Sequence, residues 1–170
     1  HAKHTVIGDG NLQADIMLIG EAPGAEEDKI GKPFVGAAGQ LLNKMLSAIN
    51  LDRNKVYITN VVPWRPPKNR TPSDEEILQC LPFLQKHIEL IKPKLIVLLG
   101  AIAAKSVLST PQSISKLRGQ WHEYKSLYLS EPILCLATYH PAFLLRSPEF
   151  KKIAWQDLQQ LKQKIENENL

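Results

Sequence analysis

The sequence has 170 residues, 44% of them hydrophobic and 22% charged, a composition typical of a soluble globular domain with one core. No apolar run approaches the ~18–20 residues that a membrane-spanning helix needs, and no signal-peptide pattern opens the chain, so we expect no membrane partner. The formal net charge of +4 is compatible with an acidic partner such as nucleic acid but does not require one.

The first half of the sequence predicts two buried strands, each followed by an irregular loop. Residues 15–19 and 56–62 are apolar runs of strand length. Between them we expect a loop over 20–39, which contains glycine and proline, and a helix over 40–49, whose apolar residues recur at helical spacing. Four prolines and three basic residues make 63–72 a second irregular loop.

The second half of the sequence alternates strands and helices again. Ser73 and Glu76 have capping-box spacing and open a helix that we expect to reach about residue 90. Residues 120–129 alternate only loosely, which is compatible with a hairpin or with an irregular excursion. The other expected elements are buried strands over 94–99 and 133–138, a short helix over 101–108 and a final helix over about 149–166.

Four apolar strands that alternate with helices predict a single α/β domain over residues 1–170, with three α/β/α layers around a four-stranded parallel sheet. In such sheets, binding residues gather on loops beyond the carboxyl ends of the strands. Three unusual loops, over 20–39, 60–72 and 139–147, each follow a predicted strand. We therefore expect these loops to converge.

Several common motifs are absent. Gly24 and Gly31 are too far apart for a phosphate-binding P-loop, and Pro33 stands where that motif has Ser or Thr. No Gly-x-Gly-x-x-Gly, His-Glu-x-x-His or Gly-x-Ser-x-Gly sequence occurs. His140 has no cysteine or second histidine beside it, so we expect no metal site.

The three loops carry motifs that resemble those of the family-4 uracil-DNA glycosylases. The motifs are Gly20-Glu-Ala-Pro-Gly-Ala-Glu-Glu-Asp28 with Gly31-Lys-Pro-Phe-Val-Gly36, Asn60-Val-Val-Pro-Trp-Arg-Pro-Pro-Lys-Asn-Arg-Thr-Pro72, and Thr138-Tyr-His-Pro-Ala-Phe-Leu-Leu-Arg146. Their order and spacing match the family from about Val6 to Leu161. The resemblance implies a uracil-DNA glycosylase-like fold and a monomeric cytoplasmic enzyme, active at the nucleoid on uracil-containing DNA, single- or double-stranded.

The resemblance also implies a [4Fe-4S] cluster on four cysteines, and here the sequence departs from the family. Cys80 resembles the last ligand, but Trp64 stands at the third ligand position and no Cys-x-x-Cys occurs. An indole cannot bind iron, so we expect no cluster and interpret Cys80 and Cys135 as reduced, buried thiols. Trp64 is expected to fill the vacated space. Residues 61–72 also lack the histidine with which a related branch traps its product, so we expect turnover.

The motif residues are expected to bind a uracil that has rotated out of the DNA stack. Phe34 can stack on the base, unless it is a core residue that anchors its loop. The amide of Asn60 matches N3–H and O4 of uracil, a pairing that cytosine reverses, unless Asn60 merely caps a turn. Gly20 and Ala22 are expected to contribute to the same binding site.

Cleavage of the N-glycosidic bond resembles glycoside hydrolysis, with an oxocarbenium-like sugar and a departing uracil anion. We expect His140 to donate to O2 of that anion as a neutral imidazole, although a lone histidine is usually structural. Glu21 is the first candidate to position water, with Glu27 and Asp28 as alternatives and a solvated acidic loop as the competing interpretation. The expected catalytic residues of this monofunctional glycosylase are Glu21, Asn60 and His140.

Two further groups are expected to contact DNA. Arg65, Lys68 and Arg70 are candidates for phosphate contacts, unless they belong to an ordinary solvated loop. The second group suits a wedge that fills the gap left by the flipped base, unless both leucines are core residues. It consists of Leu144, Leu145 and Arg146. Two other functions stay open, a weak or inactive binder of damaged or single-stranded DNA and a hydrolase of small nucleosides.

Overall fold

The computed structural model describes residues 2–170, which contain a six-stranded mixed sheet in the order β1-β3-β2-β4-β6-β5. The four central strands run parallel to their neighbours, and the two edge strands pair antiparallel. The strands are β1 (Asp9–Gly10), β2 (Ile16–Gly20), β3 (Val56–Asn60), β4 (Leu95–Leu99), β5 (Trp121–Tyr124) and β6 (Ile133–Thr138).

The predicted α/β fold and its four parallel strands are confirmed, but the prediction of only four strands is wrong. The additional strands lie at the two edges. β1 has two residues, and β5 has four of which only Tyr124 is buried. Neither is long enough or buried enough to produce a recognisable hydrophobic period. Because β5 pairs antiparallel with β6, residues 120–129 belong to the hairpin rather than to an irregular excursion.

Seven α-helices and two short 3₁₀ helices complete the described part of the chain. They are α1 (Ala25–Ile30), α2 (Ala37–Ala48), η1 (Pro67–Asn69), α3 (Asp74–Ile91), α4 (Ala101–Leu108), α5 (Ile114–Leu117), α6 (Pro141–Arg146), η2 (Pro148–Phe150) and α7 (Lys151–Asn167). The predicted capping box is present, since the Glu76 amide donates to Ser73 Oγ over 3.2 Å and the Ser73 amide donates to Glu76 Oε1 over 2.9 Å. None of the helices in residues 2–170 is long and apolar enough to span a membrane.

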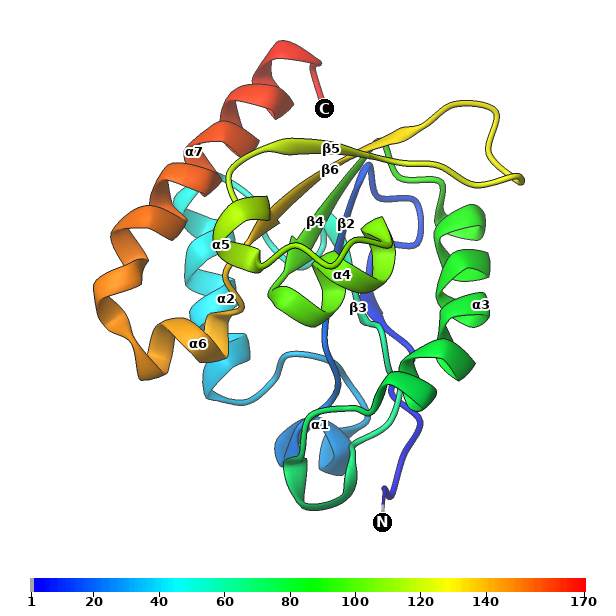
Figure 1. The fold of residues 1–170 in the computed structure, drawn as a ribbon. Helices are drawn as coiled ribbons and strands as arrows, with labels where there is room; N and C mark the ends of the chain where they lie inside the picture. Colours follow the sequence, from blue (N-terminus) through cyan, green and yellow to red (C-terminus); the bar gives the residue numbers. More distant parts are fainter. Residues whose placement is uncertain (1) are drawn as a thin grey trace.

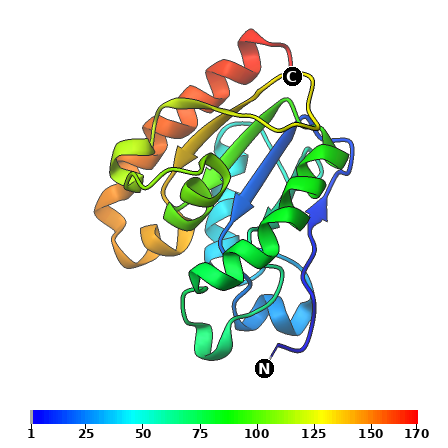
Figure 2. The ribbon, with the colours of Figure 1, turned by 45° about the vertical axis from the view of Figure 1, so that its right-hand side comes forward.

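Helices cover both faces of the sheet, as Figures 1 and 2 show. The four central strands divide their apolar side chains between these two helical layers. Met17 and Ile19 of β2 face the layer that contains α3 and α4. Ile16 and Leu18 face the opposite layer, which contains α2, α6 and α7. Because successive strand residues point to opposite faces, a continuous apolar run satisfies both layers. The molecule therefore has the three layers that the sequence predicts.

The carboxyl ends of the parallel strands lie together at the end of the sheet near α1 (Figure 1). Gly20, the last residue of β2, is opposite Asn60 of β3, and Leu99 of β4 is opposite Thr138 of β6. In both ribbon views, α1 and the loop around η1 lie side by side beyond this edge. The loops that follow β2, β3 and β6 therefore meet at one place.

Candidate functional site

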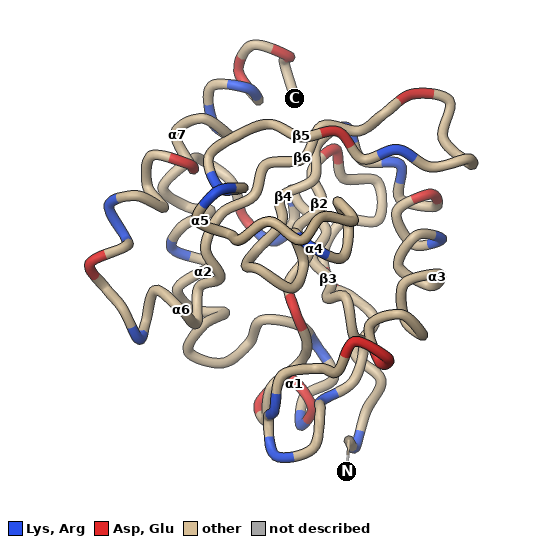
Figure 3. Tube along the Cα trace, viewed as in Figure 1, with Lys and Arg blue, Asp and Glu red and all other residues tan. Residues whose placement is uncertain are grey.

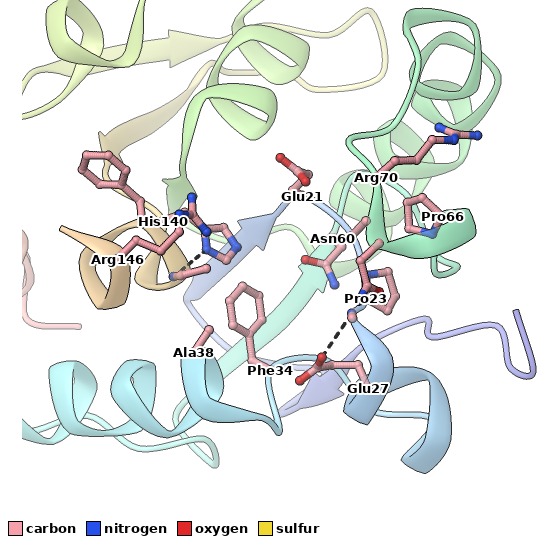
Figure 4. A pocket seen from close by; sticks show the side chains of 15 residues that line it. Glu21, Pro23, Glu27, Phe34, Ala38, Asn60, Pro66, Arg70, His140 and Arg146 are labelled. Atoms are coloured by element: carbon pink, nitrogen blue, oxygen red, sulfur yellow. Dashed lines mark hydrogen bonds between the residues drawn. The ribbon is translucent and has the colours of Figure 1, made fainter.

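A pocket of about 280 Å³ opens where these loops meet. The side chains of Glu21, Phe34, Asn60 and His140 line it, and Figure 4 shows them arranged around a common space. They come from loops and strand ends that are up to 119 positions apart, from residue 21 to residue 140. The structure thus brings together the residues that the motifs singled out.

Asn60 presents an unsatisfied acceptor at the base of the pocket. Its side chain is buried, with 5% exposure, and Oδ1 has no hydrogen-bond partner within the described part of the chain. A Cβ on Gly20 would lie 2.6 Å from Asn60 Oδ1 and 2.6 Å from Phe34 Cζ, so only glycine at that position allows both side chains to approach. A buried polar atom without a partner is costly, and a bound ligand with a donor would relieve that cost.

Phe34 forms an apolar wall beside His140. Its ring is buried and lies 5.4 Å from the imidazole, centroid to centroid, with 27° between the planes. The backbone of Phe34 is in the left-handed region at φ 54°, which is uncommon for a bulky residue. Phe34 is therefore held in an unusual conformation at the surface of the pocket rather than on the apolar face of a helix or strand.

His140 is held as a neutral donor by its position at the start of α6. The amide of Ala142 donates to His140 Nδ1 over 3.0 Å, so Nδ1 is an acceptor and the proton of the neutral ring is on Nε2. Burial lowers the pKa of His140 to about 4, and the positive charge of Arg146 acts in the same direction. At neutral pH, His140 can therefore donate one hydrogen bond through Nε2 without carrying a charge.

The three candidate carboxylates have different surroundings. Both oxygens of Glu27 are used by backbone amides, since Oε1 accepts from Gly24 over 3.1 Å and Oε2 accepts from Val35 and Gly36 over 2.8 and 2.7 Å. The bonds to Val35 and Gly36 join helix α1 to the segment that carries Phe34, and Figure 4 shows Glu27 beside Phe34. The carboxylate of Glu27 is therefore committed to shaping the pocket.

Asp28 lies outside the pocket lining and is buried, with 1% exposure. Its Oδ1 accepts from the amides of Lys3 and His4 over 2.8 and 2.9 Å, and these bonds lower its pKa. Asp28 thus ties the N-terminal segment to α1. Glu21 and Glu27 both line the pocket, and of these two only the carboxylate of Glu21 accepts no hydrogen bond from a backbone amide of residues 2–170. Burial raises the pKa of Glu21, while the nearby Arg146 opposes that shift.

The basic residues that were expected to contact DNA differ in whether their charges are paired. Arg70 and Arg146 line the pocket, but Arg70 forms a 2.6 Å ion pair with Glu76. Arg65 donates to Asn69 Oδ1 over 2.7 Å, and Lys68 is exposed on η1. In Figure 3, basic and acidic segments lie close together around α1, so the charge at this end of the molecule is mixed.

The prediction that both leucines contact DNA needs correction. Residues 141–146 form helix α6, not an exposed loop, and Leu144 is 1% exposed in the core against α2 and α7. Leu145, the next residue, is 43% exposed. A short helix sends adjacent side chains about 100° apart, so one leucine is in the core and the other on the surface. Leu144 is thus a core residue, and only Leu145 is available for a wedge.

A second cavity, of about 620 Å³, lies between β3, α3 and the N-terminal segment. Trp64 and buried Cys80 both line it, whereas Cys135 lies in β6 and does not. No cluster of three or more His, Cys, Asp or Glu side chains that could bind a metal occurs in residues 2–170. One thiol and an indole do not fit the four-thiolate ligand set of a [4Fe-4S] cluster.

Arg53 is a structurally important residue that the motifs did not indicate. It follows α2, donates to the carbonyl oxygens of Pro33 and Phe34, and pairs with Asp9 over 2.9 Å. An isolated arginine between a helix and a strand has no recognisable pattern in the sequence. Its partners are backbone atoms of a distant segment, so only the fold reveals the contact.

Sequence comparisons with known proteins point to the same family as the motifs that line the pocket. The sequence model described as "Uracil DNA glycosylase superfamily" matches residues 7–159. The chain is 44% identical to the type-4 uracil-DNA glycosylase of Sulfurisphaera tokodaii, over 94% of this chain and 74% of that protein. It is 43% identical to the type-4 uracil-DNA glycosylase of Thermotoga maritima, over 97% and 85% of the two chains. Similarity to the type-5 uracil-DNA glycosylase of Pyrobaculum aerophilum is lower, 35% over 58% of this chain and 50% of that protein.

Proposed function

This chain belongs to the uracil-DNA glycosylase superfamily, and we propose that it hydrolyses the N-glycosidic bond of uracil in DNA and leaves an abasic site. The observation that carries the proposal is the unpaired Oδ1 of Asn60 at the base of a pocket walled by Phe34 and His140. Uracil has an N3–H donor that Oδ1 can accept, and its O4 can accept from the amide nitrogen. Cytosine has the opposite polarity at both positions and would leave buried groups unmatched.

The proposed reaction begins with a uracil that has left the base stack and lies against Phe34. As the glycosidic bond breaks, its electron pair moves onto the base and negative charge gathers at O2. The Nε2–H of His140 donates to that oxygen, and a preorganised donor of this kind is worth about 3–4 kcal/mol. No proton transfer from His140 is required, which agrees with its low pKa of about 4.

Water completes the reaction: its oxygen bonds to C1′ of the sugar, and the proton that it releases neutralises the departing uracil anion. We assign Glu21 to orient this water and to favour the positive charge on the sugar, because Glu21 lines the pocket and no backbone amide of residues 2–170 engages it, whereas amides engage Glu27 and Asp28. Lysine does not occur among the described residues that line the pocket, so no imine with the sugar is expected. The proposed enzyme is therefore monofunctional and does not cut the strand.

The pocket is complete within one chain, which supports a monomer as the active form. We propose that Arg65, Lys68, Arg70 and Arg146 contact phosphates and that Leu145 fills the gap left by the flipped base. A DNA substrate implies that the protein works where the DNA is, which the resemblance predicts to be the nucleoid.

The direct test is excision from oligonucleotides that contain a single uracil, followed by alkali cleavage of abasic sites. The wild-type protein should cut at uracil and not at cytosine, and Asn60→Ala should lose about 10- to 100-fold in rate because a buried polar pairing is lost. Asn54→Ala, which changes an exposed turn residue that does not line the pocket, should match the wild type. Binding of uracil-containing DNA without base release would favour a binder, and equal activity on free deoxyuridine would favour a small-nucleoside hydrolase.

We also propose that this chain carries no four-cysteine iron–sulfur cluster, and that Trp64 packs in the corresponding space. Support comes from the cavity that Trp64 shares with Cys80, the one cysteine among its described lining residues. Trp64→Ala should reduce the free energy of unfolding by about 1–2 kcal/mol, less than a fully buried tryptophan would, because Trp64 is 37% exposed. Leu127→Ala, at a side chain that is 99% exposed, is the control. Stoichiometric iron and acid-labile sulfide in the purified protein, or an unchanged stability of Trp64→Ala, would contradict the proposal.

A further inference from the structure

The segment that carries Phe34 is held in place from three sides. A Cβ on Gly39 would lie 1.9 Å from the Phe34 carbonyl oxygen, so the start of α2 packs directly on this backbone. The amides of Val35 and Gly36 are bound by Glu27 on the pocket side. Phe34 itself adopts a φ of 54°, a conformation that a bulky residue keeps only when its surroundings determine it.

The third side is supplied by Arg53, which binds the carbonyl oxygens of the same segment. Nη1 donates to the Phe34 oxygen over 2.9 Å, and Nη2 donates to the Pro33 oxygen over 2.6 Å. The guanidinium is anchored in turn by Asp9 of β1, whose Oδ2 accepts from Nη2 over 2.9 Å and from Nε over 3.2 Å. Arg53 therefore connects the edge of the sheet to the backbone on which the aromatic wall of the pocket depends.

We propose that Arg53 is a positioning residue for the reaction, which fixes the ring of Phe34 against the flipped base without touching the base itself. Arg53 does not line the pocket, so its effect passes through the Pro33–Phe34 backbone. The inference rests on the proposed function, since it requires Phe34 to stack on uracil. A planar guanidinium serves two carbonyl groups and a carboxylate at once, whereas a lysine ammonium cannot reproduce that fork.

The test compares Arg53→Ala and Arg53→Lys with Lys55→Ala. Lys55 lies in the same segment between α2 and β3 and carries the same charge, but it binds the Asn50 carbonyl oxygen and not Pro33 or Phe34. Both Arg53 variants should lose about 10- to 100-fold in single-turnover excision, as expected for a misplaced contact group. Inhibition by free uracil should weaken in parallel. Binding to DNA that carries an abasic-site analogue should stay unchanged, because that ligand has no base to stack. Lys55→Ala should match the wild type in all three measurements.

Two further measurements test the positioning role of Arg53 even if Arg53→Ala folds poorly. Asp9→Asn weakens the anchor and keeps both carbonyl contacts, so it should show a smaller loss of the same kind. Hydrogen exchange of the Val35 and Gly36 amides should quicken in the Arg53 variants. Wild-type excision rates in Arg53→Lys and Arg53→Ala, or an equal loss of affinity for abasic DNA, would overturn the positioning role. An inactive wild-type protein would instead remove the proposed function.

Discussion

Glu21 and His140 are both partly or largely desolvated, and burial shifts their pKa values in opposite directions. Burial disfavours the ionised form of each group, so it raises the pKa of Glu21 and lowers the pKa of His140 to about 4. The positive charge of Arg146 lowers both values, which helps Glu21 to ionise and keeps His140 neutral. At neutral pH His140 is therefore a neutral donor, while the pKa of the neighbouring Glu21 lies above its ordinary value.

This arrangement predicts an acidic limb in the pH profile of excision. Glu21 must be ionised to orient water, so kcat/KM should fall as the pH drops through a pKa that lies above the ordinary 4.5. Glu21→Gln should have a lower rate at pH 7 and should lose this limb. A limb that persists unchanged in Glu21→Gln would assign the titration to another group and contradict the role of Glu21.

At the residue scale, the sequence predicted which side chains share the pocket but not how the acidic residues divide their tasks. Asn60 is the last residue of β3 and His140 comes shortly after the end of β6, so the rule for parallel sheets brings them together. Glu27 and Asp28 are neighbours in the sequence, yet one binds amides of the Phe34 segment and the other binds amides near the N-terminus. These partners depend on how α1 packs, which no local pattern indicates.

Helix α6 determines which of the two adjacent leucines is available to contact DNA. Pro141 begins the helix directly after His140, and the same turn that fixes the imidazole also directs Leu144 into the core. Leu145 then points outward beside the exposed Arg146. A wedge on a short helix is held more firmly than one on a loop, because its base is packed against α2.

We therefore expect the two adjacent leucines to respond differently to truncation. Leu145→Ala should slow excision from double-stranded DNA by several-fold and leave single-stranded excision unchanged, because only a duplex requires the base to be flipped. Leu144→Ala should instead lower the free energy of unfolding by about 2–5 kcal/mol. Thermal unfolding and excision on both substrates distinguish the two effects. Equal losses on single- and double-stranded DNA for Leu145→Ala would argue against a wedge.

At the element scale, long apolar runs were predictable and short elements were not. The four central strands and α3 follow from hydrophobic runs and a capping box. Helix α1 has six residues and is bounded by Gly24 and Gly31, so the loop composition of 20–39 conceals it. Helix α6 is equally short and is recognisable only from Pro at its first position. Short elements depend on tertiary contacts, which explains why periodicity misses them.

For the whole molecule, the distribution of unpaired cations predicts the DNA-binding surface better than the net charge of +4 does. Arg118 pairs with Asp157, Arg53 with Asp9 and Arg70 with Glu76. Lys68 and Arg146 are exposed near the pocket and have no ion pair among residues 2–170. Since a paired cation must give up its partner to bind phosphate, the unpaired ones should dominate the electrostatic part of DNA binding.

This difference predicts the salt dependence of DNA affinity. Each phosphate contact that is lost should reduce the slope of log Kd against log salt concentration by about 1, so Lys68→Ala and Arg146→Ala should each have that effect. Arg70→Ala should change the slope less, because Glu76 already neutralises the guanidinium in the free protein. Lys125→Ala removes the same charge from the β5–β6 hairpin, at the end of the sheet away from the pocket (Figure 1), and should leave the slope unchanged. If Lys125→Ala lowered the slope as much as Lys68→Ala, DNA would be responding to net charge, and the surface around the pocket would not be the binding face.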